Sequence, residues 1–408
     1  MDIQEQMRIL QQGTQEIVSL GELRDKLLRA SREGRPLTVK LGLDPSAPDI
    51  HLGHTVVLRK IRQFQNLGHR AVLIIGDFTG RIGDPTGRSR TRPALTAEQV
   101  LENARTYELQ LFRVLDPAKT ELRFNGEWLG ELRFADVVKL GSTTTVARIL
   151  ERDDFHNRFT AQQSIGVHEL LYPLMQAYDS VHLHADVELG GTDQRFNILC
   201  GRDLQRAYGQ EAQCAIFMPL LEGLDGREKM SKSLGNYVGV DESPDDMLGK
   251  LMSIPDGLIS RYFELVTDIH PDELAEMRDG LAAGTLNPRD AKLRLAVDVT
   301  TLYHGAQAAG DARERFESRF SRRELPQDAP SFAVPPSLCG PDGADLARLL
   351  LAAGLAPSLS EARRLTAQGA VRLNGKRQSG PQLIWRSGDI LQAGRLRAVR
   401  LMEDTDNG

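Results

Sequence analysis

The 408-residue chain has few cysteines, few aromatic side chains and no long apolar run, and each shortage excludes a class of protein. Its three cysteines, Cys200, Cys214 and Cys339, are too widely spaced for a CxxC metal site or a disulfide framework. No apolar stretch approaches the roughly 20 residues that span a membrane, and the polar residues 1–6 do not resemble a secretory signal. We therefore expect a protein of the reducing cytoplasm with no membrane anchor.

The chain also lacks a large excess of either charge sign, because its 51 basic and 56 acidic side chains leave a net charge of only −5. The distribution is uneven, because residues 344–400 hold ten basic and three acidic side chains and so carry +7. A small basic module on an acidic body favours local contact with a polyanion. A solvated surface would give the same pattern, so charge alone leaves both possibilities open.

Periodicity predicts an α/β fold. Residues 37–43 have the pattern of a strand, 53–66 that of a helix and 71–76 that of a buried strand. Together they form a βαβ unit, and further strands are expected at 180–189 and 215–220. We predict a Rossmann-like, doubly wound parallel sheet, followed by an all-helical domain and a small α+β domain.

Composition suggests where these parts begin and end. The α/β domain, with a helical segment at its start, is expected at 1–225, and a polar loop with the helical domain at 226–325. Residues 326–342 contain five prolines among Ser, Ala and Gly and are predicted to be a linker. The basic module fills the remainder, 343–408.

Two short motifs indicate chemistry. His51-Leu52-Gly53-His54 opens the first predicted helix, where free N–H groups and the positive end of the helix dipole favour phosphate. Gly53 leaves room for a nucleotide against the backbone. The polar loop Lys229-Met230-Ser231-Lys232-Ser233 offers two long-stemmed cations that can reach a pyrophosphate. The pair therefore predicts a nucleotide site.

Simpler interpretations exist for each motif. A His-x-x-His pair also occurs as a metal half-site or by chance on a surface, and the lysine loop could be merely solvated. No third Cys, His or Glu stands at ligand spacing, so we predict no protein metal site. Taken together and in this order, the two motifs resemble the signatures of class I aminoacyl-tRNA synthetases.

The resemblance narrows to the bacterial tyrosyl-tRNA synthetases and extends over essentially the whole chain. The stretches that carry it, besides the two motifs, are Gly-Leu-Asp-Pro (42–45), Gly-Asp-Pro-Thr-Gly (83–87), Gln-Ala-Tyr-Asp (176–179) and Gly-Gly-Thr-Asp-Gln (190–194). It implies an enzyme that activates tyrosine with ATP and transfers the tyrosyl group to the 3′-terminal adenosine of tRNA(Tyr). It also implies a homodimer, with Mg²⁺ carried on ATP.

The resemblance assigns the site residue by residue. Tyrosine is expected to contact Thr79, Asp84, Tyr172, Gln176, Asp179 and Gln194. ATP is expected to contact Gly42, Asp44, Ser46, His51, Gly53, His54, Gly191, Asp193, Lys229, Met230, Ser231 and Lys232. The catalytic groups around the phosphates are expected to be His51, His54, Arg88, Arg92, Lys229 and Lys232.

Elementary chemistry agrees with this assignment in part. Tyr172, Gln176 and Asp179 are spaced i, i+4 and i+7, so one helical face can present an acceptor for a phenol and partners for an ammonium. Taken alone, Asp179 could equally be an exposed helix residue, Asp84 a turn residue and Asp193 a cap. One position departs from the family: Lys40 stands where its best-known members have a tyrosine that contacts the substrate hydroxyl.

The basic module resembles the S-four-like RNA-binding domain of these enzymes through residues 360–365, 369–375 and 387–391. Asn374-Gly375 predicts a two-residue hairpin turn. The RNA contacts are expected at Arg363, Arg364, Arg372 and Lys376. Two rival functions remain. A tryptophanyl enzyme is disfavoured because Asp179 within Gln-Ala-Tyr-Asp favours tyrosine, whereas an indole offers one donor and no acceptor. A non-catalytic RNA-binding protein is disfavoured because both motifs are intact.

Overall fold

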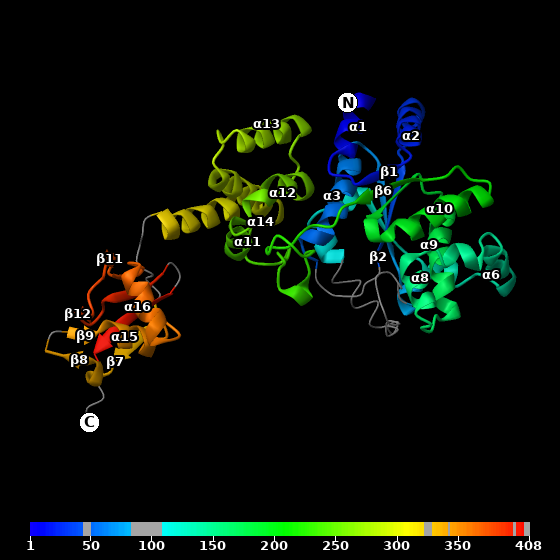
Figure 1. Ribbon diagram of the computed structural model, residues 1–408. Coiled ribbons are helices and arrows are strands. Elements are labelled where there is room, and N and C mark those ends of the chain that lie inside the picture. Colours follow the sequence, from blue (N-terminus) through cyan, green and yellow to red (C-terminus); the bar gives the residue numbers. More distant parts are fainter. Residues whose placement is uncertain (44–49, 83–107, 322–328, 342, 395–396, 404–408) are drawn as a thin grey trace. The chain divides into compact units, whose positions relative to one another are not determined.

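The computed structural model describes residues 1–43, 50–82, 108–321, 329–341, 343–394 and 397–403. The chain divides into two compact units, Met1–Ala312 and Arg313–Gly408 (Figure 1). In the described ranges, no helix is both long enough and apolar enough to cross a membrane.

A six-stranded sheet forms the centre of the first unit, with strand order β1-β6-β5-β2-β3-β4. Its strands pair in parallel, except that β1 runs antiparallel to β6. Their bounds are β1 Glu16–Val18, β2 Thr38–Leu43, β3 Arg70–Ile75, β4 Thr120–Phe124, β5 Val187–Gly191 and β6 Cys214–Met218. The predicted parallel sheet and its first βαβ unit are confirmed, with α3 (Leu52–Asn66) between β2 and β3.

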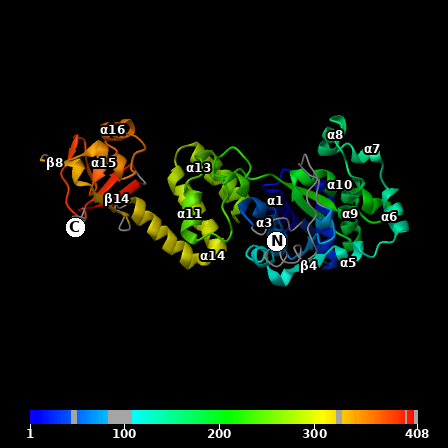
Figure 2. The ribbon, with the colours of Figure 1, turned by 90° about the horizontal axis from the view of Figure 1, so that it is seen from below.

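Helices and short 3₁₀ turns surround this sheet. Their bounds are α1 Ile3–Gln11, α2 Leu20–Glu33, η1 Thr79–Arg81, η2 Pro117–Lys119, α5 Gly126–Leu129, α6 Phe134–Gly141, α7 Val146–Ile149, α8 Asp153–Thr160, α9 Val167–Leu183, η3 Thr192–Gln194 and α10 Arg195–Ala207. Of these helices, α9 and α10 pack side by side in both views (Figures 1 and 2).

The strand predicted at 180–189 is wrong in its first half. Residues 180–183 are the last turn of α9, which ends at His184 in the left-handed conformation (φ 48°) before β5 begins at Val187. The error has a physical origin, because a short apolar run is compatible with either a buried helix or a buried strand. Here Val181 packs with Leu174 and Ala177 in a helical cluster.

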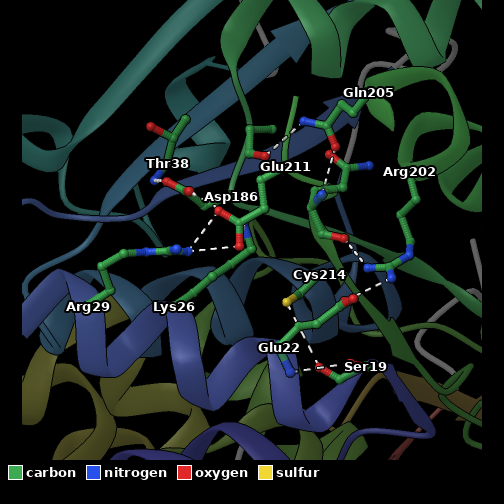
Figure 3. A network of polar contacts seen from close by, with 12 residues as sticks. Ser19, Glu22, Lys26, Arg29, Thr38, Asp186, Arg202, Gln205, Glu211 and Cys214 are labelled. Carbon is green, nitrogen blue, oxygen red and sulfur yellow. Dashed lines mark hydrogen bonds and ion pairs between the residues drawn. The ribbon is translucent and has the colours of Figure 1, made fainter. Parts of the chain in front are cut away.

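The N-terminal segment is held to the sheet by a network of polar contacts (Figure 3). Ser19 caps α2 by accepting from the backbone N–H of Glu22, and the Glu22 carboxylate pairs with Arg202 of α10 at 2.8 Å. One turn further along α2, the buried Lys26 ammonium lies 3.7 Å from an Asp186 oxygen and 3.6 Å from a Glu211 oxygen. These contacts lie at the amino ends of β2 and β5.

The all-helical region predicted after the α/β part is confirmed. Its helices are α11 Pro244–Met252, α12 Ile259–Val266, α13 Pro271–Ala282 and α14 Pro288–Ser321, with 3₁₀ turns at η4 Lys232–Leu234 and η5 Asp256–Leu258. Helix α14 is interrupted at Gly305, whose φ of 81° is not helical. The fully buried Tyr262 of α12 donates to the Glu222 carbonyl at 2.7 Å and so joins the helices to the segment that carries the lysine motif.

The second unit is a small α+β domain with its own apolar core. Its elements are β7 Ser331–Val334, η6 Pro336–Leu338, β8 Cys339–Gly340, β9 Gly343–Asp345, α15 Leu346–Ala352, α16 Leu359–Ala367, β10 Val371–Leu373, β11 Lys376–Arg377, β12 Gln382–Leu383, β13 Ile390–Ala393 and β14 Arg397–Glu403. The strands form a five-stranded sheet, β11-β10-β13-β14-β7, and a three-stranded sheet, β12-β9-β8. Asn374 and Gly375 both have positive φ between β10 and β11, as the predicted hairpin turn requires.

Candidate active site

A cavity of about 350 Å³ opens at the carboxyl ends of the central strands. From β2 the chain passes through α3 to β3 on one side, while β5 lies on the other side of β2. In open parallel sheets such a reversal of strand order leaves a crevice where ligands bind. The predicted site residues that line the cavity are Gly42, Gly53, His54, Thr79, Tyr172, Gln176, Asp179, Gly191, Asp193 and Gln194.

Asp179 lies at the closed end of this cavity and is only 3% exposed. Its Oδ1 atom accepts from Trp128 Nε1 at 2.8 Å and its Oδ2 atom from Asn125 Nδ2 at 3.5 Å. Burial raises the pKa of Asp179 to about 7, against the opposing effects of the Lys40 charge and the Trp128 and Asn125 hydrogen bonds. Asp179 is therefore a buried acceptor held in a fixed orientation, not an exposed helix residue.

The spacing argument for α9 is confirmed by the geometry. Tyr172, Gln176 and Asp179 all line the cavity from this one helix. Across from them, Asn125 also donates to Thr79 Oγ1 at 3.0 Å and accepts from the Phe78 N–H at 3.1 Å, which fixes its amide. The closed end of the cavity is thus assembled from α9, η1 and the segment that follows β4.

His51 and His54 form the amino-terminal cap of α3. His51 Nδ1 accepts from the Gly53 N–H at 3.2 Å, His54 Nδ1 accepts from the His51 N–H at 3.3 Å, and the rings stack at 3.9 Å. Accepting through Nδ1 places the proton of each neutral ring on Nε2. Burial, then His54 and Lys232, lower the pKa of His51 to about 3, while burial and Lys232 lower the pKa of His54 to about 4. Both rings are consequently neutral donors near pH 7.

The segment that follows the lysine motif in sequence is hydrogen-bonded to the start of α3. Leu52 N–H donates to the Val238 carbonyl at 2.9 Å, and Val240 N–H donates to the Ile50 carbonyl at 3.1 Å. Met230 of the motif is buried, and its Cβ lies 3.5 Å from the position that a Cβ on Gly53 would take. The histidine and lysine motifs, far apart in sequence, therefore meet in the structure.

The two lysines of the motif have different surroundings. The ammonium of the half-buried Lys232 lies 5.6 Å from the centre of the Tyr237 ring and close enough to the histidines to lower both of their pKa values. Lys229 is exposed, and its backbone forms a β-bridge with Glu222. Ser231 Oγ lies 2.9 Å from Ser233 Oγ. In this state, Lys232 is the lysine nearer to the histidines.

Gly191 and the turn that follows it form the other rim of the cavity. Asp193 and Gln194 belong to η3, and Asn197 donates to Gln194 Oε1 at 3.0 Å. A Cβ on Gly191 would lie 2.4 Å from Asp193 Oδ1, so glycine is required for this carboxylate to fold back over the strand end.

The predicted RNA-contacting residues belong to the second unit. Arg363 and Arg364 are exposed on α16, and Arg364 pairs with Glu361 at 2.8 Å. Lys376 is exposed on β11, while Arg372 of β10 donates to the Gly375 carbonyl at 3.1 Å across the hairpin turn. The helix and the hairpin each present basic side chains.

Five predicted site residues, Asp44, Ser46, Asp84, Arg88 and Arg92, lie outside the described residues. Among the residues that the structure does describe, no group of three or more His, Cys, Asp or Glu side chains could hold a metal ion.

Sequence reasoning missed three side chains that hydrogen-bond to the cavity-lining residues Asp179 and Gln176: Asn125, Trp128 and Glu188. Asn125 and Trp128 fall in the sequence Asn-Gly-Glu-Trp directly after β4. Tryptophan is rare in this chain, which has only two. Because the strand β4 was itself not predicted, the available signal was only a rare tryptophan shortly after the run 120–124. Glu188 gave a weaker one, as a carboxylate within an otherwise apolar strand.

Comparison with known proteins agrees with this geometry. The family described as tRNA synthetases class I (W and Y) matches residues 32–321, and the S4 domain matches residues 346–391. The tyrosine–tRNA ligase of Moorella thermoacetica is 56% identical over 98% of this chain and 96% of its own. Tyrosine–tRNA ligase 2 of Clostridium acetobutylicum is 54% identical over 98% and 99%.

A solved tyrosyl-tRNA synthetase from Archaeoglobus fulgidus, complexed with L-tyrosine, supports the fold. Its TM-score is 0.61 at 24% identity, with 76% of this chain and 100% of that chain covered. The cavity at the strand ends, the paired motifs and the near full-length likeness lead to one conclusion. The chain belongs to the tyrosine–tRNA ligases of the class I aminoacyl-tRNA synthetase family.

Proposed function

We propose that this protein activates L-tyrosine with ATP and transfers the tyrosyl group to tRNA(Tyr). The observation that carries the proposal is the buried Asp179 carboxylate at the closed end of a cavity whose other side is the histidine-capped start of α3. A phenolic hydroxyl needs an acceptor, which Asp179 supplies, whereas an indole offers only a donor N–H at a different position. ATP is the co-substrate of this enzyme family.

In the amino-acid half of the site, Asp179 accepts from the phenolic hydroxyl. Gln176, Tyr172 and Asp84 surround the substrate ammonium, Gln194 reaches the carboxylate and Thr79 contributes to the wall. The cavity between α9 and the ends of β2 and β5 supports this assignment for the described members of the set.

In the nucleotide half, the adenosine lies against Gly42, Asp44, Gly53, Gly191 and Asp193. The phosphates contact Ser46, His51, His54, Arg88 and Arg92, together with Lys229, Met230, Ser231 and Lys232 of the loop. The substrate carboxylate attacks the α-phosphorus of ATP and pyrophosphate leaves, which gives tyrosyl-adenylate. A ribose hydroxyl of the terminal tRNA adenosine then attacks the carbonyl carbon of the adenylate, the bond from that carbon to the phosphate oxygen breaks, and AMP leaves. No protein nucleophile is required, since positioning and charge stabilisation supply the acceleration. Mg²⁺ arrives on the ATP phosphates.

Tyrosine-dependent ATP–pyrophosphate exchange without tRNA tests the first step, with phenylalanine and tryptophan in parallel. Exchange with tyrosine alone is the expected result. Exchange with tryptophan instead would agree with the synthetase family but contradict tyrosine as the substrate. Absence of exchange with all three amino acids would contradict the catalytic role. Charging of tRNA(Tyr) tests the second step.

We also propose that the protein is a homodimer of the cytoplasm. Large apolar side chains are exposed on α6, α7, α8 and the start of α9, which lie together at one edge of the first unit (Figure 2). Phe134 is 84% exposed and Val167 75%, and Val138, Val146 and Phe159 accompany them. Burying this surface against its copy would remove it from water.

Light scattering after size-exclusion chromatography tests the dimer. The double variant Phe134→Glu/Phe159→Glu is expected to be monomeric, while Ile384→Glu, at an exposed apolar position in the second unit, leaves the mass unchanged. Equal masses for wild type and the double variant would contradict the proposed interface.

A further inference from the structure

Lys40 and Glu188 form a buried ion pair beneath the amino-acid half of the cavity. They lie directly opposite each other on the neighbouring strands β2 and β5, are 0% and 1% exposed, and their Nζ and Oε1 atoms are 3.0 Å apart. The remaining protons of Lys40 reach the Gln176 carbonyl at 3.0 Å and Ser180 Oγ at 2.7 Å. All three ammonium protons therefore have acceptors inside the protein, and none is left for a substrate.

Glu188 is satisfied just as fully. Its Oε1 atom also accepts from Gln176 Nε2 at 3.2 Å, and its Oε2 atom accepts from Ser180 Oγ at 3.1 Å and from Gln213 Nε2. Gln213 is held in turn by Arg202, which donates to its carbonyl and belongs to the network of Figure 3. The pair thus joins β2, β5 and α9 to the framework of the sheet.

Stability does not account for such a pair. Two charges lose their hydration on burial, and well-packed apolar residues of similar volume are often equally or more stabilising. A fully satisfied buried network instead fixes the orientation of its members. The members here include Gln176, which lines the cavity, and Ser180, one turn further along α9.

Glu188 determines which end of the Gln176 amide reaches the cavity. A carboxylate only accepts hydrogen bonds, so Gln176 must turn its Nε2 toward Glu188. Its Oε1 atom is then the group available to a ligand in the cavity. An amide oxygen is the right partner for an ammonium, which only donates.

Lys40 also acts on Asp179, one turn along α9 from Gln176. Burial raises the pKa of Asp179, and the Lys40 charge is the largest opposing influence, ahead of Trp128 and Asn125, while Glu188 raises it weakly. The outer surroundings of Trp128 are His182, stacked at 4.4 Å, and Arg123 at 5.4 Å. Lys40 therefore favours the ionised carboxylate that can accept from a phenol.

We propose that the Lys40–Glu188 pair is a positioning device for amino-acid recognition, which orients the Gln176 amide toward the substrate ammonium and holds Asp179 ready for the substrate hydroxyl. The proposal rests on the proposed function. It makes Lys40 a specificity residue that acts through its neighbours and not by contact.

The test uses the full chain with the near-isosteric double variant Lys40→Gln/Glu188→Gln, which leaves no unpaired buried charge. We expect the Kd for tyrosine at pH 7 to rise about tenfold, and the preference for tyrosine over phenylalanine in pyrophosphate exchange to fall by a similar factor. The acidic limb of the tyrosine affinity profile should move to higher pH, and the KM for ATP should stay within about twofold.

The matched control is Lys26→Gln/Asp186→Asn, which neutralises another buried lysine–carboxylate pair (Figure 3). This pair joins α2 to the residue before β5, and neither member lines the cavity. It should alter Tm without changing the pH profile or the discrimination. The single variant Lys40→Met, which strands the Glu188 carboxylate, should have the lowest Tm of the set.

Two results would overturn the proposal: a pH profile and discrimination equal to wild type in the folded double variant, or equal changes in the control variant. Failure of the wild-type enzyme to exchange with tyrosine would instead overturn the proposed function, so the two failures are distinguishable. A double variant too unstable to purify would show that the pair is needed for folding and would count against a specific positioning role.

Discussion

Gly53 illustrates how a single residue can restrict the geometry of the candidate active site. A Cβ at this position would lie 2.9 Å from His51 Cε1, inside van der Waals contact. We predict that Gly53→Ala displaces the His51 ring and lowers kcat/KM for ATP in pyrophosphate exchange by about ten- to a hundredfold. The Kd for tyrosine, measured by calorimetry, should remain near the wild-type value.

The control is Gly249→Ala, since Gly249 of α11 has open space around it. Alanine favours a helix over glycine by up to about 1 kcal/mol, so neither variant should lose much stability. A Gly53→Ala enzyme with normal ATP kinetics would contradict the role of this close approach.

Asp179 predicts a pH dependence for tyrosine binding. Its pKa is raised to about 7, mainly by burial, and a proton on the carboxylate competes with the phenolic hydroxyl. Affinity should therefore be full above pH 7 and fall below it, by up to about tenfold per pH unit. The pKa values of His51 and His54, about 3 and about 4, lie below this window and do not contribute.

Calorimetric titrations between pH 5.5 and 8.5 would measure this dependence. An Asp179→Asn variant, which has no titrating group at that position, should bind tyrosine weakly and lose the transition near pH 7. If the variant retained the wild-type pH profile, another group would be responsible.

At the residue scale, sequence reasoning found the side chains with a helical period and missed their partners. The spacing of Tyr172, Gln176 and Asp179 is a local property of one helix, so it could be read from the chain. Trp128 meets Asp179 across 51 positions of sequence, and only the folded sheet brings them together. Lys40 could be recognised as unusual, but its partner on β5 depended on strand order.

At the scale of elements, the lysine-bearing loop depends on one asparagine. The buried Asn236 accepts from Ser231 N–H at 2.8 Å and donates to Asp225 Oδ2 at 2.7 Å and to the Lys229 carbonyl at 3.2 Å. We predict that Asn236→Ala loosens the loop and lowers kcat of pyrophosphate exchange by about tenfold or more, while the Kd for tyrosine is unchanged. Pre-steady-state measurement of adenylate formation would show the change directly.

Asn287→Ala provides a comparison, because Asn287 accepts from Arg289 N–H at the start of α14, remote from the cavity lining. It should lower stability by about 1 kcal/mol and leave exchange intact. Similar kinetics for the two asparagine variants would remove the argument for a positioned loop.

Element boundaries were predictable where periodicity was long and unbroken. The βαβ unit and the helices after residue 243 agree with their patterns, whereas the short apolar run at 180–189 was divided between α9 and β5. The proline-containing segment 326–342 includes β7, which pairs with β14. That pairing could not be foreseen, because β7 has only four residues and its hydrogen-bonding partner β14 lies more than 60 residues later in the sequence.

At the scale of the whole molecule, the two units separate chemistry from RNA affinity. We predict that Arg363→Ala/Arg364→Ala weakens tRNA binding and lowers the salt dependence of log Kd by about 1 to 2. Tyrosine-dependent exchange should be unaffected, because the cavity belongs entirely to the other unit. Filter binding over a range of salt concentrations would measure the slope.

The comparison variant is Arg206→Ala, an exposed arginine of α10 in the first unit. It should leave the salt slope as it is in wild type. An unchanged slope in the double variant would remove Arg363 and Arg364 from the RNA surface.

Because Lys40 and Glu188 satisfy each other's charge inside the protein, the pair restricts which substitutions can accumulate around this cavity during evolution. Either residue replaced alone strands its partner's charge in the interior, which typically costs about 3–5 kcal/mol and is comparable to the whole stability of a marginal protein. A joint replacement avoids that intermediate. Mutant libraries that vary one codon at a time should therefore find both positions invariant. Libraries that vary the two codons together should recover functional alternatives. In natural lineages, the residues at positions 40 and 188 should be replaced together.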